Sequence, residues 1–369
     1  MPAGPRGPSL LTFPPPPSLL PQNYGSSADE MVIGWVTSNM QAPSTVQYGT
    51  SSGSYDKTAT GNSSFYKYSA RYTSGLIHHT TLSGLAPATT YYYKVAGAAQ
   101  EYSFTSSPGV GEIYPYTFGF FADIGENIDA DLTVQHLIAG SKSIDSYVLN
   151  GDISYASGCE ANGCVTWDAF QRMMSPLAAV KPIAISVGNH ETYGALCARL
   201  GVPRSFACLT PPPPPPRPTR LDDANGIVAI STQYRFAGMP FQGRKDGCMY
   251  FSYEVGPAHV ISLASFYAGG FGAASPLVAW LKGDLAAIDR SKTPWVLVSL
   301  HAPWYNSNTA HQGDGEGMRQ ALEEMLVAGG VSAFFTGHVH AVRFCAAPAR
   351  TCAKRLPTLT PHKPPTHAV

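Results

Sequence analysis

The stretch that decides the fold is YVLNGDISY, residues 147–155. Its opening apolar run ends in an amide at Asn150, a pattern that predicts a buried strand. Gly151 allows a sharp turn directly after the strand, so that the Asp152 carboxylate stands at the strand's end. An aspartate in such a place is most often a cap, and alone it establishes no site. The stretch is informative because related stretches recur along the chain.

Four other predicted strands also lead into side chains that can bind a metal. The strands predicted at 117–122, 183–187, 295–300 and 333–336 are followed by Asp123, by Asn189 with His190, by His301, and by His338 with His340. A further strand, predicted at 259–263, has no such residue after it. Helical stretches at 131–139, 167–174 and 317–328 lie between these strands. This alternation predicts an α/β domain.

The positions of these polar residues predict that they meet. In open α/β sheets the loops after the carboxyl ends of the strands converge on one crevice, so residues far apart in sequence can share a site. Two histidines at i and i+2, such as His338 and His340, can serve neighbouring ions. Mixed oxygen and nitrogen donors suit a harder ion such as iron beside zinc or manganese. The lack of cysteine among these strand-end residues argues against a thiolate site.

Residues 25–108 have a different character, because short β-rich runs alternate with turns. Strands are predicted at 31–37, 45–48, 76–82 and 91–95. The stretch GLAPATTYYY, residues 84–93, resembles the fibronectin type III signature around a tyrosine corner. We therefore predict a small β-sandwich, with an irregular β domain as the alternative. The segment has no cluster of potential catalytic groups.

Composition limits the classes of function. The 369 residues have a formal net charge of zero, whereas partners such as nucleic acid or an anionic membrane call for a basic surplus. The sequence has no apolar run long enough to span a bilayer. Seven cysteines are too few for a disulfide framework. A local disulfide between Cys159 and Cys164 would fit a secreted protein, with free thiols as the alternative, and Asn62 begins an N-x-S/T glycosylation triplet.

The order of the strand-end motifs resembles that of the calcineurin-like metallophosphoesterases. Most members of that superfamily have a histidine two residues after the first aspartate, where this chain has Gly125. Tyr155 instead follows the second aspartate by three residues, which is the mark of purple acid phosphatases, whose tyrosinate binds ferric iron. Residues 256–261 and 301–319 also look like the plant-type members. The resemblance covers about residues 25–341.

The resemblance implies a dinuclear centre. Ferric iron would be bound by Asp123, Asp152, Tyr155 and His340. A divalent ion (zinc, manganese or iron) would be bound by Asp152, Asn189, His301 and His338, so that Asp152 bridges the two ions.

The resemblance also implies the reaction. The chain would be an acid phosphatase that hydrolyses phosphate monoesters with a hydroxide activated by the Fe(III)–M(II) pair. Asn189 would contact the phosphate together with His190 and His311, both catalytic, and His311 would protonate the leaving alcohol. The alternatives are a metallophosphodiesterase or nucleotidase on the same scaffold, against which Gly125 and Tyr155 count, and a non-catalytic binder of metal or phosphate.

The implied partners are small phosphate esters, with neither nucleic acid nor a membrane. The implied location is secreted, as a glycoprotein, or vacuolar, although residues 1–21 show no clear secretory signal. The oligomeric state stays open, and a homodimer is compatible with the resemblance.

The expected organisation comprises a Pro-rich segment at 1–24, a fibronectin type III-like sandwich at 25–108, a two-sheet metallophosphoesterase domain at 109–344 with a polyproline loop at 210–218, and a Pro-rich tail at 345–369. The chain departs from the family at two places. Ala310 stands where a second histidine is common, and 342–344 replaces the usual Tyr-Glu-Arg. We expect a catalytic domain truncated at its C-terminus, a sandwich without its usual first strand, and an unstable enzyme.

Overall fold

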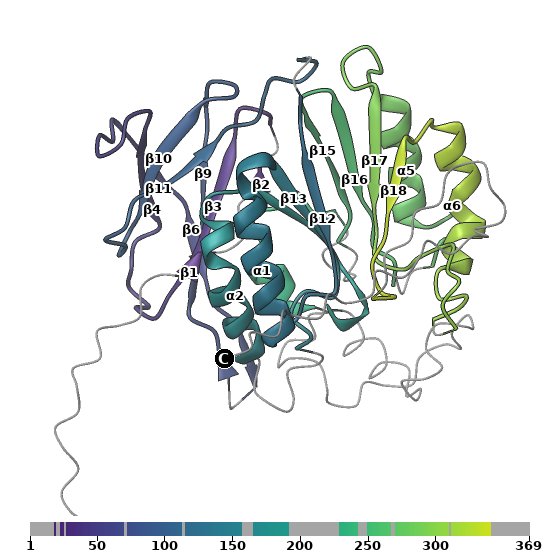
Figure 1. Cartoon of the computed structure of the whole chain (residues 1–369), viewed down its shortest axis with the longest axis horizontal. Helices are drawn as coiled ribbons and strands as arrows, with labels where there is room; N and C mark the ends of the chain where they lie inside the picture. The colour runs from purple at the N-terminus through teal and green to yellow at the C-terminus, as the bar shows by residue number, and fades with distance from the viewer. Residues whose placement is uncertain are drawn as a thin grey trace, which may run out of the picture.

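The computed structural model describes residues 18–19, 23–25, 27–69, 72–112, 115–156, 165–191, 229–242, 249–266, 270–309 and 311–340. A strand-rich unit lies beside a second unit of strands and helices (Figure 1). Several sequence predictions fall outside these residues: the pair Cys159 and Cys164, the polyproline loop, Ala310, and the chain after residue 340.

The strand-rich unit contains two antiparallel sheets, as the sequence predicted. One has the order β1-β3-β9-β6 with β2 also paired to β3, and comprises β1 (Ser18–Leu19), β2 (Asn23–Tyr24), β3 (Met31–Thr37), β6 (Asn62–Ser64) and β9 (Leu76–Leu82). The other has the order β11-β10-β4-β5, and comprises β4 (Thr45–Gly49), β5 (Lys57–Thr60), β10 (Thr90–Val95) and β11 (Tyr102–Thr105). A small hairpin is formed by β7 (Lys67–Ser69) and β8 (Tyr72–Thr73).

Alternation along β10 produces the core of the sandwich. Tyr91, Tyr93 and Val95 are buried, while the residues between them are partly exposed. The Tyr91 hydroxyl accepts the N–H of Ala86 at 2.9 Å, five residues upstream, as expected of a tyrosine corner. Leu19 on β1 is fully buried, so strands from the segment before residue 25 also pack into this unit.

The second unit contains two sheets of mainly parallel strands, the predicted α/β architecture. The first sheet is parallel throughout, in the order β12 (Phe118–Phe121), β13 (Ser146–Asn150), β14 (Ile183–Ser186). The second has the order β15 (Phe251–Val255), β16 (Ala258–Ser262), β17 (Trp295–Ser299), β18 (Ala333–Phe335), and only β15 is antiparallel to its neighbour. All five residues of β13 are buried, as is typical of a parallel strand covered on both faces.

Helices cover the outer faces of the two sheets. The helices among the described residues are α1 (Ile128–Gly140), α2 (Val165–Ala178), α4 (Ile230–Arg235), α5 (Pro276–Ala287) and α6 (Glu316–Ala328), with a 3₁₀ turn at Ser141–Ser143. Figure 1 shows α1 and α2 in front of the first sheet, and α5 and α6 beside the second. The Asn127 side chain caps α1 by accepting the N–H of Ala130. Among the described residues, no helix has the length and apolar character needed to cross a membrane.

Side chains hold the two sheets together. The rings of Phe120 on β12 and Phe335 on β18 stack with centroids 3.5 Å apart. The hydroxyls of Ser186 and Ser299 are 2.7 Å apart, and Ser262 Oγ donates to the carbonyl oxygen of Ile185 at 2.9 Å. The loops that follow these strands are thereby kept close together.

A buried histidine lies inside the sandwich. His78 is fully buried and stacks on Trp35, with ring centroids 4.7 Å apart. Its ring nitrogens lie 3.0 Å from Thr37 Oγ1 and 2.9 Å from Ser44 Oγ. Because burial disfavours the charged imidazolium, the pKa of His78 falls to about 4.

This depressed pKa predicts a loss of stability in acid. Between pH 6.5, where the unfolded histidine titrates, and about pH 4, the unfolded chain binds a proton that the folded chain does not. Unfolding should therefore become easier as the pH falls through this window, by up to about 3 kcal/mol. Urea unfolding at pH 7.5, 5.5 and 4.5 should show a weaker pH dependence in His78→Gln than in the wild type. The exposed His136→Gln is the control, and parallel curves for wild type and His78→Gln would contradict the assignment.

Candidate metal centre

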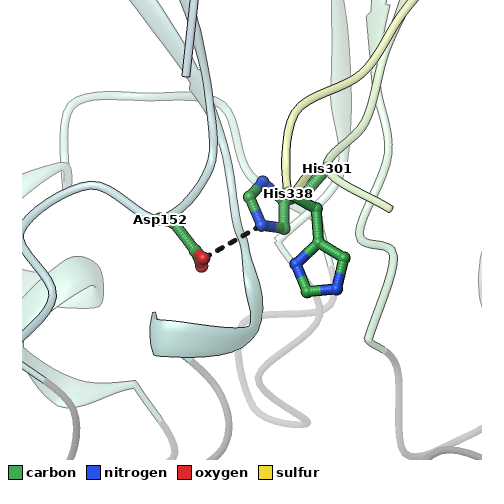
Figure 2. A group of neighbouring side chains, drawn as sticks. All are labelled: Asp152, His301 and His338. Carbon is green, nitrogen blue, oxygen red and sulfur yellow. Dashed lines mark ion pairs between the residues drawn. The ribbon is translucent and has the colours of Figure 1, made fainter. Parts of the chain in front are cut away.

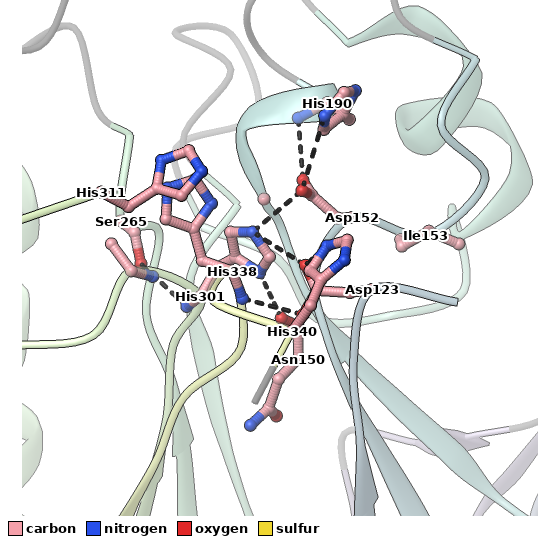
Figure 3. Close-up of polar contacts among 12 residues, drawn as sticks. Asp123, Asn150, Asp152, Ile153, His190, Ser265, His301, His311, His338 and His340 are labelled. Atoms are coloured by element: carbon pink, nitrogen blue, oxygen red, sulfur yellow. Dashed lines mark hydrogen bonds and ion pairs between the residues drawn. The ribbon is translucent and has the colours of Figure 1, made fainter. Parts of the chain in front are cut away.

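The seven predicted ligands lie at the carboxyl ends of five strands. Each follows its strand within five residues: Asp123 after β12, Asp152 and Tyr155 after β13, Asn189 after β14, His301 after β17, and His338 and His340 after β18. Both sheets thus contribute to one site. Figure 3 shows five of these residues approaching one another from separate strands, namely Asp123, Asp152, His301, His338 and His340. The predicted convergence is what the fold produces.

One group of ligands is deeply buried. Asp152, His301 and His338 each offer one ligand atom, and these atoms all lie within 4.8 Å of one another (Figure 2). His301 Nε2 is 3.1 Å from Asp152 Oδ2, and the His301 and His338 ring centroids are 5.0 Å apart. Asn189, also buried, belongs to the same predicted set. This group can hold one cation.

A second group adjoins the first and is more open. The Tyr155 hydroxyl lies 2.7 Å from His340 Nε2 and donates to Asp123 Oδ1 at 3.2 Å. His340 Nε2 is in turn 3.4 Å from the same Asp123 oxygen. Asp123 Oδ1 is also 3.7 Å from His301 Nε2, so the two groups are neighbours. The His340 side chain is 62% exposed, which leaves this side of the site accessible.

Two buried atoms test whether cations fit this donor set. Asn189 Oδ1 and His301 Nε2 are buried, and neither has a hydrogen-bond partner of adequate geometry among the described residues. His301 Nδ1 lies 2.6 Å from the carbonyl oxygen of Asn150, to which it must donate, so Nε2 is the nitrogen that can offer a lone pair. Buried polar atoms normally have partners, and a cation would supply one to both. The residues therefore fit a metal.

The charges in the site also favour a cation. Burial raises the pKa of Tyr155 well above its usual value, and the carboxylates of Asp123 and Asp152 raise it further. A cation among these groups would reverse that field and stabilise the phenolate. Burial alone would also raise the pKa of Asp152, but its neighbours His301 and His190 hold it below its ordinary value.

Most of the described residues with strained backbone are at this site. Eight described non-glycine residues have positive φ, and six of them belong to the predicted site: Asp123, Asp152, Tyr155, His311, His338 and His340. Their φ angles lie between 47° and 71°, the left-handed region that costs a side chain about 1–2 kcal/mol. Such conformations persist only where the surroundings impose them, and they gather at functional sites.

Two glycines permit the close approach of the loops. Gly151 has φ of 80°, and a Cβ there would stand 2.6 Å from His301 Nδ1. A Cβ on Gly188 would stand 2.2 Å from Asp152 Oδ1. The sequence analysis expected glycine beside these residues, and the structure supplies a steric reason: neither position has room for a Cβ.

Glu191 is a functional residue to which the sequence analysis gave no role. Its buried carboxylate accepts three backbone N–H groups at 2.9 Å each, from Asp152, Ile153 and Gly188. It thereby ties the loop after β13 to the loop after β14. Burial and the charge of Asp152 raise the pKa of Glu191 to about 7. The only signal in the sequence was its place beside His190 in the same motif.

The two predicted phosphate-contacting histidines lie on opposite sides of the ligands in Figure 3. The His190 ring lies against Tyr155 with centroids 4.3 Å apart, and its backbone N–H donates to Asp152 Oδ1 at 2.9 Å. The His311 ring lies against His338 with centroids 4.1 Å apart. Asp314, a second residue that sequence reasoning missed, contacts both His311 and His338. No motif marked Asp314, which follows His311 by three residues.

Comparison with known proteins identifies both units. A family model described as the N-terminal domain of purple acid phosphatases matches residues 17–107. A second, described as calcineurin-like phosphoesterase, matches residues 116–342. The fold and the strand-end ligands thus define a calcineurin-like metallophosphoesterase.

Individual relatives place the chain more narrowly. It is 33% identical over 346 residues to purple acid phosphatase 22 of Arabidopsis thaliana, covering 90% of this chain and 71% of that protein. It is 34% identical to purple acid phosphatase 18 of the same plant, with coverage of 84% and 62%, and 34% identical to a phosphoenolpyruvate phosphatase of Allium cepa, with coverage of 84% and 59%. The chain belongs to the purple acid phosphatase family, which implies a dinuclear metal centre, and it spans about 59–71% of these relatives' lengths.

A solved structure agrees on the fold. The purple acid phosphatase PPD1 from yellow lupin (Lupinus luteus) seeds superposes with a TM-score of 0.69 at 20% identity, covering 87% of this chain and 58% of the lupin chain. The sandwich-plus-metallophosphoesterase architecture predicted from the sequence is therefore confirmed.

The close approach at Gly151 predicts that an alanine there disrupts the site. Gly151→Ala adds a left-handed Cβ against His301, and it should weaken metal binding by about tenfold or more. The effect is measured by elemental analysis of the metal content of variant and wild-type protein after both are exposed to the same metal concentration. Gly140→Ala is the matched control, because a Cβ at Gly140 meets nothing within 4 Å. Equal metal content in Gly151→Ala and wild type would show that the loops tolerate the extra atom.

Proposed function

We propose that this chain is an acid phosphatase that hydrolyses small phosphate monoesters at a dinuclear metal centre. The observation that supports this most is the position of Asp152. Its carboxylate lies 3.1 Å from His301 of the first ligand group and beside Asp123 of the second group (Figure 3). One carboxylate between two donor sets is what a bridging ligand requires. The relatives named above are phosphatases, which supports the reaction.

The proposal assigns each group to one ion. Ferric iron would be held by Asp123, Asp152, Tyr155 and His340, a set that includes a phenol and two carboxylates suited to a hard ion. A divalent ion (zinc, manganese or iron) would be held by Asp152, Asn189, His301 and His338. The support comes from the distances within each group and from the partnerless atoms Asn189 Oδ1 and His301 Nε2.

When bound, the two ions supply a water of lowered pKa and positive charge beside the phosphate oxygens. The chain's own residues do the rest. Asn189, His190 and His311 surround the place where the phosphate would lie, and they orient it. His190 has a partly exposed side chain, and the His311 side chain is 47% exposed, so both can reach a substrate.

His311 supplies the proton in the bond-breaking step. The bond between phosphorus and the leaving oxygen breaks as a water-derived oxygen bonds to phosphorus. The proton moves from His311 to the leaving oxygen, which departs as an alcohol. Phosphate and alcohol are the products, and His311 regains a proton from solvent.

Secretion or a vacuolar location is part of the same proposal. The relatives reported above come from plants. Asn62 is exposed on β6, where a glycan would be sterically accessible.

The reaction is tested by the dependence of the rate on the leaving group. His311→Ala should lower kcat for an alkyl phosphate such as glycerol phosphate by about 10²–10⁴-fold, because a poor leaving group needs the proton. The loss for 4-nitrophenyl phosphate should be far smaller. The exposed neighbour Gln312→Ala is the control. Equal losses on both esters would give His311 a binding role, and wild-type preference for bis(4-nitrophenyl) phosphate would favour a phosphodiesterase instead.

The ferric position is tested by colour. A tyrosinate bound to ferric iron absorbs visible light, so iron-loaded wild-type protein should be coloured and Tyr155→Phe should lose the band. Phenylalanine keeps the ring that packs on His190, so the fold should be retained. Tyr305→Phe, at a half-exposed tyrosine outside the ligand set, is the control. An unchanged spectrum in Tyr155→Phe at equal iron content would show that Tyr155 is not a ligand.

A further inference from the structure

One carboxylate oxygen at the edge of the site contacts two histidines at once. Asp314 Oδ2 lies 2.9 Å from His338 Nε2 and 3.1 Å from His311 Nδ1. The His338 side chain is 3% exposed and that of Asp314 is 19% exposed, so this contact is shielded from water. Asp314 therefore contacts both a proposed ligand of the divalent ion, His338, and the proposed proton donor, His311.

The Asp314 side chain has no part in starting the helix that follows it. The N-cap of α6 is Gly315, and no side chain caps the helix there. Glu316, the acidic residue of the first turn, pairs with Arg319. The hydrogen bonds of Asp314 are directed into the site, and helix capping does not account for them.

The bond to Asp314 decides which nitrogen His338 can offer a metal. Because Nε2–H donates to Asp314, the lone pair that remains is on Nδ1. His301 is held in the mirrored way, with Nδ1 donating to the Asn150 carbonyl and Nε2 left over. Partners of this kind fix the tautomer and the ring orientation of a ligand histidine and raise its basicity.

The same oxygen also determines the orientation of the His311 ring and which of its nitrogens is free. With Nδ1 bonded to Asp314, Nε2 is the nitrogen left to face a leaving oxygen. The His311 ring bonds to Asp314 and lies against His338. An exposed ring without the Asp314 bond would sample several orientations, and proton transfer depends on correct orientation.

We propose that Asp314 is a positioning residue that orients His311 for proton donation and His338 for the divalent ion, a role that rests on the function proposed above. Proton donation and divalent-metal affinity are then linked through one side chain. A change at Asp314 affects both, whereas a change at His311 affects proton donation alone.

The experiment compares Asp314→Ala and Asp314→Glu with wild type in two measurements. Asp314→Ala should lower kcat for glycerol phosphate by about 10–100-fold, with a much smaller loss for 4-nitrophenyl phosphate. Calorimetric titration with Zn²⁺ should show an affinity about tenfold weaker at one of the two positions. Asp314→Glu keeps the carboxylate and should recover part of both losses. The tyrosinate absorption should be unchanged, because Asp314 bonds to His311 and His338, which are not among the proposed ferric ligands.

A double variant separates the two effects. In protein that already has His311→Ala, adding Asp314→Ala should not widen the difference between the kcat losses for glycerol phosphate and 4-nitrophenyl phosphate. The imidazole that Asp314 positions is then absent. The loss of Zn²⁺ affinity should persist in the double variant, since it acts through His338. Full additivity of the two leaving-group effects would overturn the role in proton donation.

Controls keep this role distinct from the proposed function. Asp129→Asn, at an exposed carboxylate on α1, should change neither measurement. Unchanged leaving-group dependence and Zn²⁺ affinity in Asp314→Ala would overturn the proposal. The proposal would also be overturned if Asp314→Ala lost one ion completely and Asp314→Glu did not restore its binding, because Asp314 would then itself be a ligand.

If wild-type protein hydrolyses no phosphate ester, the proposed function fails, while the Zn²⁺ titration still decides whether Asp314 supports His338. Asp314→Asn replaces the alanine variant if the latter lacks a cooperative melt.

Discussion

The Asp152 carboxylate is the charge around which the rest of the structure is arranged. It is 2% exposed, and a buried charge without compensation costs several kcal/mol. The His190 N–H at 2.9 Å supplies part of that compensation, and two cations held by the neighbouring candidate ligands, with His301 at 3.1 Å among them, would supply far more. Placing these partners around one carboxylate requires strand ends from both sheets. The packing of the sheets against each other is therefore a precondition for the chemistry.

The fold also offsets the strain stored in the ligand loops. Six site residues are left-handed, and each such residue is destabilised by about 1–2 kcal/mol. Glu191 counteracts part of this by accepting three N–H groups from the loops after β13 and β14. Buried strands directly before these loops leave the backbone little freedom to relax. Strain of this kind holds donor atoms at fixed positions before any ion arrives.

The sandwich contributes to the site through helix α2. Arg235 is 1% exposed and binds Asp168 and Gln171 of α2 together with Tyr72 of the sandwich. The N–H of Leu19 donates to Ser175 Oγ of the same helix at 2.9 Å. Residues of α2 share an apolar core with β13 and β14, whose ends bear Asp152 and Asn189. The two units are thus one packed body on the side that supports the ligands.

Much of this protein could be read from its sequence because its signals are local. An apolar strand followed by glycine and a donor residue is visible in the chain, and the strand predicted at 147–150 differs from β13 by one residue. The parallel arrangement that alternation implies then brings the strand ends to one place. Fold class, the types of the candidate ligands and their convergence were therefore determined by the sequence alone. The tertiary structure alone decided the contacts of Glu191 and Asp314, the left-handed conformations, and the hydrogen-bond partners of His301 and His338. These features depend on atoms far apart in the chain, such as Asp314 with His338 or His301 with Asn150, and only packing sets those distances.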